Sequence, residues 1–139
     1  MFQKILLAYD GSEHSQRAAA MAQDLAVKYG SAIRIVYAFN PISRIIGNPA
    51  LEERMQRETV QGNEIVEQAA APLRAVGLDP HLEVLEGPPA DAILRVAEVR
   101  EVDLIIMGSR GLGSAIALFL GSVSNKVLQE AKCPVLITR

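Results

Sequence analysis

The residues with the clearest chemical potential are glycines and small hydroxyl side chains towards the end of the chain. Gly108-Ser109-Arg110-Gly111-Leu112-Gly113-Ser114 follows a short apolar stretch, and Gly121-Ser122-Val123-Ser124 opens a helical pattern. Glycine permits positive φ and lets backbone N–H groups approach a ligand closely. A helix start adds unpaired N–H donors and the positive end of the helix dipole. Together these groups suit anion binding, and phosphate is the natural candidate.

Two better-known phosphate motifs do not match this segment. Gly108 and Gly113 have the outer spacing of a P-loop, but Ser114-Ala115 stands where Lys followed by Ser or Thr is required. The glycines are also in the wrong order for the dinucleotide fingerprint G-x-G-x-x-G, and they follow a late strand instead of the first. The sequence therefore disfavours a P-loop enzyme and a NAD enzyme.

The rest of the chain alternates strand-like and helix-like segments, which must position these glycines. Short apolar runs rich in β-branched residues predict strands, and apolar residues at three- and four-residue spacing predict helices. The predicted strands are Lys4–Tyr9, Ala32–Phe39, His81–Leu85, Asp103–Met107 and Val135–Thr138. The predicted helices are a first one between an N-cap at Ser12 and a C-terminal stop at Gly30, then Leu51–Val76, Ala90–Val99 and Ser122–Ala131.

This alternation predicts an α/β fold with a doubly wound, five-stranded parallel sheet covered by helices on both faces. In such sheets the ligand site lies beyond the carboxyl ends of the strands, where the winding reverses. The loops after the first, second and fourth strands are therefore the places to look.

Two segments are less regular. Pro72 lies inside the second helical pattern, so we expect a bend there or a helix that stops before it. Residues 40–49 carry two prolines and a glycine but also three isoleucines, which suggests a loop that packs against the domain.

Length and composition limit the function further. A chain of 139 residues, half of them hydrophobic, suits one domain over residues 1–139. A net charge of -2 and 4% aromatic residues are unlike a nucleic-acid binder. The longest apolar stretches are far short of the ~20 residues that a membrane span requires. With no signal-peptide pattern and the single Cys133, we expect a cytoplasmic protein.

The glycine spacing resembles that of a known family. Gly108, Gly111 and Gly121-Ser122 match the G-x2-G-x9-G-[S/T] ATP-binding signature of the universal stress proteins. The opening Ile5-Leu6-Leu7-Ala8-Tyr9-Asp10-Gly11-Ser12-Glu13 and the Cys133-Pro134-Val135-Leu136-Ile137 segment are also similar to that family. Its fold is adenine-nucleotide alpha-hydrolase-like, so the resemblance implies the strand order 3-2-1-4-5.

The resemblance implies a set of nucleotide-binding residues. Ala8, Asp10 and Ala38 would lie around adenine, and Met107 and Gly108 near the ribose and the first phosphate. The phosphate chain would be held by backbone N–H and hydroxyl groups of Gly111, Gly121, Ser122, Val123 and Ser124. ATP is the implied cofactor, and the resemblance allows a divalent cation such as Mg²⁺ to be bound with its phosphates. Arg110 either clamps phosphate or lies in solvent, and the sequence leaves both open.

Other candidate side chains have simpler interpretations. Asp10 before Gly11-Ser12 is also a common turn residue, and both roles can coexist. We interpret His14 as a solvated surface residue in the first turn of its helix, and His81 has no ligand partner nearby in sequence. Cys133 has no His or Cys at helical or turn spacing, so we expect a buried thiol rather than a nucleophile. The charged run around Glu52 to Glu58 predicts a solvated helix face.

Three classes of function agree with these observations. The first is an ATP-binding regulatory protein of the stress response, and the second is a slow ATPase or a nucleotidyl-transfer enzyme on the same fold. The third is a nucleotide binder of the electron-transfer flavoprotein type. The sequence favours the first, because a phosphoryl-transfer site needs a positioned base and cationic charge that these loops, Arg110 apart, do not supply.

Two further expectations concern order and assembly. The loop from Ser109 to Leu120 is expected to be poorly ordered without ligand, because it is glycine-rich and lacks regular hydrogen bonds. The last strand, Val135 to Thr138, is apolar and lies at a sheet edge in the expected order. We therefore expect a homodimer formed by antiparallel pairing of this strand, as is common in universal stress proteins.

Overall fold

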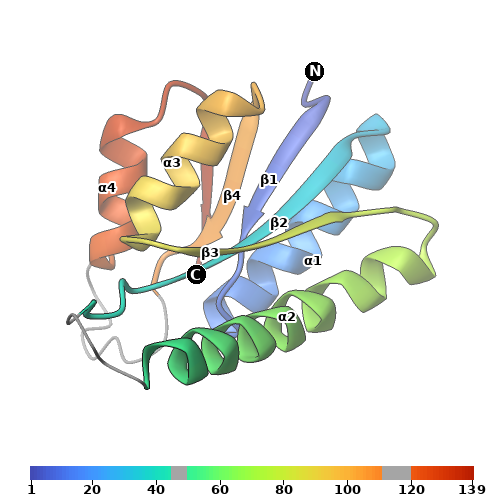
Figure 1. Cartoon of the computed structure of the whole chain (residues 1–139). Helices are drawn as coiled ribbons and strands as arrows, with labels where there is room; N and C mark the ends of the chain where they lie inside the picture. The colour runs from blue at the N-terminus through green and yellow to red at the C-terminus, as the bar shows by residue number, and fades with distance from the viewer. Residues whose placement is uncertain (45–49, 111–119) are drawn as a thin grey trace.

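A computed structural model of the chain describes residues 1–44, 50–110 and 120–139. Its five strands are all parallel and lie in the order β3-β2-β1-β4-β5 (Figure 1). Four helices connect or follow them in these described ranges. The predicted fold class and strand order are therefore confirmed. The bounds are β1 Lys4–Ala8, α1 Glu13–Tyr29, β2 Ala32–Phe39, α2 Leu51–Ala75, β3 His81–Glu86, α3 Pro89–Val99, β4 Leu104–Gly108, α4 Ser122–Glu130 and β5 Val135–Thr138.

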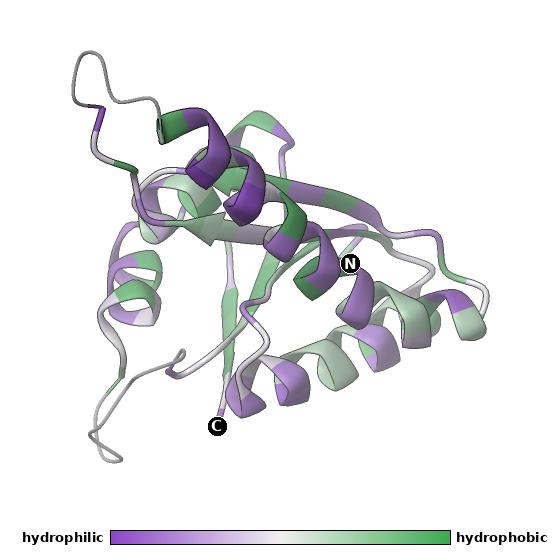
Figure 2. Cartoon of the chain, turned by 60° about the horizontal axis from the view of Figure 1, so that its bottom comes forward, coloured by the Kyte–Doolittle hydropathy of each residue, from purple (hydrophilic) through white to green (hydrophobic). Residues whose placement is uncertain are grey.

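The two faces of the sheet bury separate cores. Alternate residues of β1 point to opposite faces, so Ile5 and Leu7 contact one core while Leu6 and Ala8 contact the other. Helices α1 and α2 close the first core, largely through alanines that let α1 approach the sheet. Helices α3 and α4 close the second core on the opposite face (Figure 1). Along each helix hydrophobic and hydrophilic stretches alternate, as expected for helices with one buried side (Figure 2).

The caps of α1 form as its sequence predicts. The Ser12 hydroxyl accepts a hydrogen bond from the Ser15 N–H at 3.2 Å, which satisfies one of the free donors of the first turn. Gly30 adopts the left-handed conformation, with φ of 65°, and ends the helix. These caps fix where α1 begins, directly after β1, and so place its first turn at the edge of the sheet that carries the strand ends.

The helix does not stop before Pro72, because α2 runs from Leu51 to Ala75 with this proline inside it. Pro72 lies on the exposed side of the helix, so the Gln68 carbonyl that loses its partner can be hydrated. On the other side Ala69, Ala70 and Leu73 are buried against the sheet. This packing outweighs the local cost of the proline.

The direction of winding reverses between β1 and β4. From β1 the chain proceeds outward through β2 to β3, and it then returns to the other side of β1 to form β4 and β5. Because all strands are parallel, their carboxyl ends share one edge of the sheet. β1, β2 and β4 end around the reversal point, so the residues that follow them meet there. Within the described ranges, no helix combines the length and apolar character needed to cross a membrane.

Candidate functional site

A cavity of about 530 Å³ lies at the carboxyl edge of the sheet, over the reversal between β1 and β4. Its volume is in the range of small-molecule sites, about 300–1,000 Å³. Every predicted site residue that the structure describes lines it: Ala8, Asp10, Ala38, Met107, Gly108, Arg110, Gly121, Ser122, Val123 and Ser124. Gly111 and the rest of the predicted loop at 111–119 lie outside the described residues.

The end of β2 leaves a backbone donor and acceptor facing the cavity. The Tyr9 N–H donates to the Val36 carbonyl at 3.0 Å, and the Gly87 N–H donates to the Phe39 carbonyl at 3.0 Å. Backbone groups alternate direction along a strand, so those of Ala38 point, like those of Val36, towards the β1 side. There β1 has already ended, since its pairing with β2 stops at Ala8 opposite Val36, so no residue of β1 lies beside Ala38. This pair is available to a ligand with an adjacent donor and acceptor.

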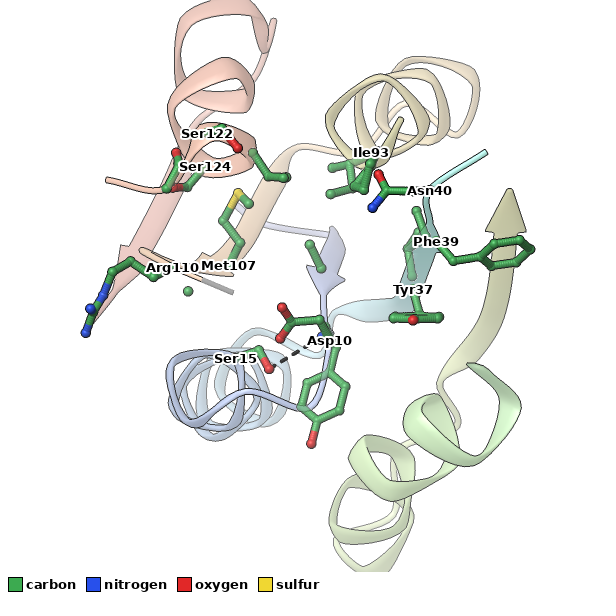
Figure 3. A pocket seen from close by; sticks show the side chains of 18 of the residues that line it. Asp10, Ser15, Tyr37, Phe39, Asn40, Ile93, Met107, Arg110, Ser122 and Ser124 are labelled. Carbon is green, nitrogen blue, oxygen red and sulfur yellow. Dashed lines mark hydrogen bonds between the residues drawn. The ribbon is translucent and has the colours of Figure 1, made fainter. Parts of the chain in front are cut away.

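Asp10 combines a turn role with a place in the cavity. Its Oδ1 accepts from the Ser12 N–H at 2.9 Å, and its own N–H donates to the Ser15 hydroxyl at 3.4 Å. Figure 3 shows the carboxylate directed into the cavity, opposite Met107. The two interpretations offered by the sequence therefore coexist: the turn holds Asp10 in place, and its carboxylate faces the space that a ligand would occupy.

The two glycine sites are joined through the carbonyl oxygen of Ser109. This oxygen accepts from the Gly121 N–H at 2.7 Å and from the Ser124 hydroxyl at 2.7 Å. Two of the groups predicted to hold phosphate, the Gly121 N–H and the Ser124 hydroxyl, thus already donate hydrogen bonds within the protein. The helical bonds of α4 begin with the Asn125 N–H, which donates to the Gly121 carbonyl at 2.9 Å. The backbone N–H groups of the first turn, at Ser122, Val123 and Ser124, therefore remain as anion donors.

Gly108 allows a close contact between β4 and the start of α1. A Cβ atom at this position would lie 2.6 Å from the His14 Cβ, 2.8 Å from the His14 carbonyl carbon and 2.9 Å from the Ser15 nitrogen. The glycine is required for this approach and not for a positive φ, because Gly108 is not among the residues with positive φ. Gly121 likewise has φ of -65°, which any residue adopts.

His14 is half-buried, and protein groups contact both of its ring nitrogens. Its Nδ1 lies 2.7 Å from the Ser109 hydroxyl, and its Nε2 lies 3.0 Å from an Arg110 guanidinium nitrogen. Loss of water around the ring lowers the pKa of His14, and the guanidinium groups of Arg110 and Arg17 lower it further. Sequence offered one signal for this contact, namely that both segments follow strands expected to be neighbours.

Several other lining residues were not predicted. Most are strand-end or loop residues beside predicted ones, such as Tyr37, Asn40 and Ile93, which Figure 3 places around the cavity. The complete additional set is Tyr9, Ser15, Val36, Tyr37, Phe39, Asn40, Pro41, Ile42, Arg54, Glu58, Pro89 and Ile93. Arg54 and Glu58 correct the expectation that the start of α2 is only a solvated face. Burial, followed by the charges of Glu58 and Asp10, raises the pKa of Tyr37.

The remaining reactive side chains lie away from the cavity. His81 is exposed at the start of β3, at the opposite edge of the sheet. Cys133 is a half-buried free thiol, and burial raises its pKa. Among the residues that the structure describes, no three His, Cys, Asp or Glu side chains gather to hold a metal ion.

Comparison with known proteins shows the family of the chain. The family model described as "Universal stress protein family" matches residues 1–139. The chain belongs to the universal stress protein family. A universal stress protein of Thermus aquaticus is 45% identical over 139 residues, which is 100% of each chain. The resemblance noted in the sequence is therefore confirmed.

Solved structures of universal stress proteins share the fold. UspA from Lactobacillus plantarum aligns with a TM-score of 0.87 at 24% identity, over 99% of this chain and 98% of its own. A universal stress protein solved in complex with cAMP aligns with a TM-score of 0.77 at 27% identity, over 99% and 97% of the two chains. The strand order and the reversal point thus belong to the universal stress protein fold.

We expect Gly108 and Gly121 to differ in how well they tolerate an added methyl group. Gly108→Ala should lower the free energy of unfolding by about 1–3 kcal/mol, because the added Cβ collides with the backbone of α1. Gly121→Ala is the matched control, because its Cβ would meet its nearest atoms, Arg110 Cα and Ser109 O, at 3.4 Å. Urea denaturation of both variants checks this. Equal stability losses would contradict the steric role of Gly108.

Proposed function

We propose that residues 1–139 form one cytoplasmic, ATP-binding regulatory domain of the stress response, with ATP in the cavity at the sheet reversal. The observation that carries this proposal is the composition of the cavity: an open backbone donor–acceptor pair at Ala38 and a helix start with unpaired N–H groups, both lining one space of about 530 Å³. The first suits an adenine edge and the second suits phosphate. Membership of the universal stress protein family and the relative solved with cAMP support the choice of an adenine nucleotide.

The base would lie against the ends of β1 and β2. The N–H and C=O of Ala38 can pair with an acceptor and a donor on the edge of adenine. Ala8, Ile93 and Met107 supply apolar surface for the ring. The Asp10 carboxylate, which can only accept hydrogen bonds when ionised, suits the hydroxyl groups of the ribose.

The phosphates would lie towards α4. The N–H groups of Ser122, Val123 and Ser124 point out of the first turn, where the helix dipole favours negative charge. Arg110 lines the same end of the cavity and supplies a cation. Mg²⁺ would be held by phosphate oxygens and water, which is its usual mode in nucleotide sites, since the described residues form no metal-binding cluster.

Turnover of the bound nucleotide is expected to be slow or absent. Hydrolysis needs a group that orients or deprotonates water near the terminal phosphate. His14, a ring nitrogen close to this end of the cavity, is engaged by Ser109 and Arg110 on its two sides. The geometry thus favours a binding module over the ATPase or nucleotidyl-transfer alternative.

Assembly is a separate proposal. Strand β5 is at the edge of the sheet, and the Pro134 and Thr138 carbonyls accept bonds from Ile105 in β4 and from Ser109 directly after β4. By alternation the backbone groups of Val135 and Ile137 point outward, away from β4. An apolar edge strand with outward-facing donors and acceptors can pair with a second copy. We propose an antiparallel homodimer through Val135 to Thr138.

ATP binding can be tested at a single backbone N–H. Ser122→Pro removes the N–H at the first helical position, where proline is tolerated and where Gly121 is already extended. Ser122→Ala is the matched control, which loses the hydroxyl but keeps the N–H. Loss of a hydrogen bond to a charged group costs about 1.5–3 kcal/mol, so Ser122→Pro should weaken ATP roughly 10- to 100-fold relative to Ser122→Ala in calorimetry. Equal affinities would place the phosphates elsewhere.

The rate of hydrolysis separates the regulatory protein from an enzyme. Purified protein saturated with ATP and Mg²⁺ should release phosphate well below about 1 s⁻¹, the low end of ordinary enzyme turnover. The measurement is a steady-state phosphate assay with Ser122→Pro as the control for contaminating ATPases. A faster rate that this variant abolishes would favour the enzyme.

The dimer can be tested at Ile137. Ile137→Pro removes an outward-facing N–H from the edge, whereas Ile137→Ala loses the same side chain but keeps the N–H. The parent and Ile137→Ala should sediment as dimers at micromolar concentration, and Ile137→Pro as a monomer. Dimers in all three proteins, or a monomeric parent, would show that β5 is not the interface.

A further inference from the structure

Three chain segments meet at His14. His14 is in the first turn of α1, while Ser109 and Arg110 directly follow β4. The imidazole lies between them, with Nδ1 at 2.7 Å from the Ser109 hydroxyl and Nε2 at 3.0 Å from Arg110 Nη2. The Thr138 hydroxyl at the end of β5 donates to the His14 carbonyl at 3.0 Å, which anchors the backbone below the ring.

The chemistry of these partners determines the protonation state of the ring. A guanidinium group has only donors, so Nε2 must offer its lone pair to Arg110. Nδ1 then carries the proton and donates to the Ser109 hydroxyl. The arrangement therefore requires neutral His14 in one tautomer. A proton on Nε2 would remove the acceptor and set two cations against each other.

The charged groups around His14 agree with a neutral ring. Arg110 faces it from the end of β4, Arg17 faces it from α1, and Glu13 is the nearby carboxylate. Arg17 is itself directed towards β5, because its Nε donates to the Arg139 carbonyl. Loss of water and the two guanidinium groups lower the pKa of His14, and Glu13 and Thr138 oppose them without reversing the direction.

Because His14 holds the Arg110 guanidinium, this side chain lies at the rim of the cavity and does not extend across its centre. Its residue lines the cavity beside Gly121 and Ser122. Figure 3 shows its guanidinium extending away from the space between Asp10, Met107 and Ile93. A cation in this position is close to the phosphate end but is bound to a protein acceptor.

We propose that neutral His14 is a positioning residue that holds Arg110 at the cavity rim, and that protonation of His14 releases Arg110 to an anionic phosphate ligand. The identity of the ligand rests on the function proposed above, whereas the contact between His14 and Arg110 does not. Binding of a phosphate ligand and uptake of a proton are then linked.

The direction of the linkage follows from the charges. When Arg110 moves to phosphate, the ring loses a cationic neighbour and gains an anionic one, so the pKa of His14 rises in the complex. A ligand that raises the affinity of a group for protons binds more tightly where protons are abundant. Affinity should therefore increase as the pH falls from 8 to 6, through the ordinary range of histidine.

The first test observes the contact in the ligand-free protein. The chain has 2 histidines, so NMR of ¹⁵N-labelled imidazoles resolves His14 from the distant His81. We expect the Nδ1–H tautomer for His14, and Arg110→Met should raise the pKa of His14 and leave the His81 signal unchanged. An Nε2–H tautomer, or a His14 titration that Arg110→Met does not move, would overturn the proposal.

The second test measures the linkage. His14→Gln keeps an amide oxygen that can accept from Arg110 but cannot titrate. ATP affinity is compared at pH 6 and pH 8 by calorimetry in the parent, His14→Gln and Arg110→Met. The ionisation of ATP itself affects all three proteins equally. The gain at pH 6 should be about three- to tenfold larger in the parent than in either variant, since one pKa unit corresponds to a factor of ten.

The outcomes separate the two proposals. Equal pH dependence in the parent and His14→Gln would overturn the linkage while leaving ATP binding intact. If none of the proteins binds ATP at either pH, the proposed function fails and the linkage fails with it. The NMR titration then still decides whether His14 holds Arg110.

Discussion

The backbone and hydroxyl of Ser109 connect four of the elements around the site. Its N–H donates to the Thr138 carbonyl at the end of β5, and its carbonyl accepts from Gly121 and Ser124 at the start of α4. Its hydroxyl contacts His14 at the start of α1. Ser109 is 6% exposed, so these bonds replace hydration that is no longer available. They fix the relative positions of two helix starts and two strand ends.

This junction can form only because the sheet reverses direction between β1 and β4. The reversal brings the start of α1, which follows β1, beside the residues that follow β4. Gly108 then allows the contact, since any side chain there would meet the backbone of α1. The close approach leaves His14 within reach of both Ser109 and Arg110. Packing of the two cores thus sets the distances at the site.

Local signals predicted the elements well, and non-local ones were harder to read. The caps at Ser12 and Gly30 and the apolar strands depend on adjacent residues, so the helices and the parallel sheet followed from local patterns. The strand order followed from the resemblance to the universal stress proteins. Pro72 does not end α2, because the local cost of the proline is outweighed by Ala69 and Leu73, whose burial depends on the sheet. His14 and Ser109 are 95 positions apart, and only the expected pairing of the strands that precede them points to their contact. The same holds for Arg54 and Glu58, which reach the cavity from α2.

The cavity separates groups that are fixed by the fold from groups that can respond to a ligand. The donors at Ala38 and at the first turn of α4 belong to the backbone, so they are held in place by the sheet and the helix and need no side-chain ordering. Arg110 is different, because its partner in the protein is a neutral imidazole, a weaker acceptor than a phosphate. A ligand anion therefore competes for Arg110 on favourable terms. Since that exchange also changes the charge that His14 prefers, Arg110 is the point at which occupancy of the cavity can alter the junction at Ser109.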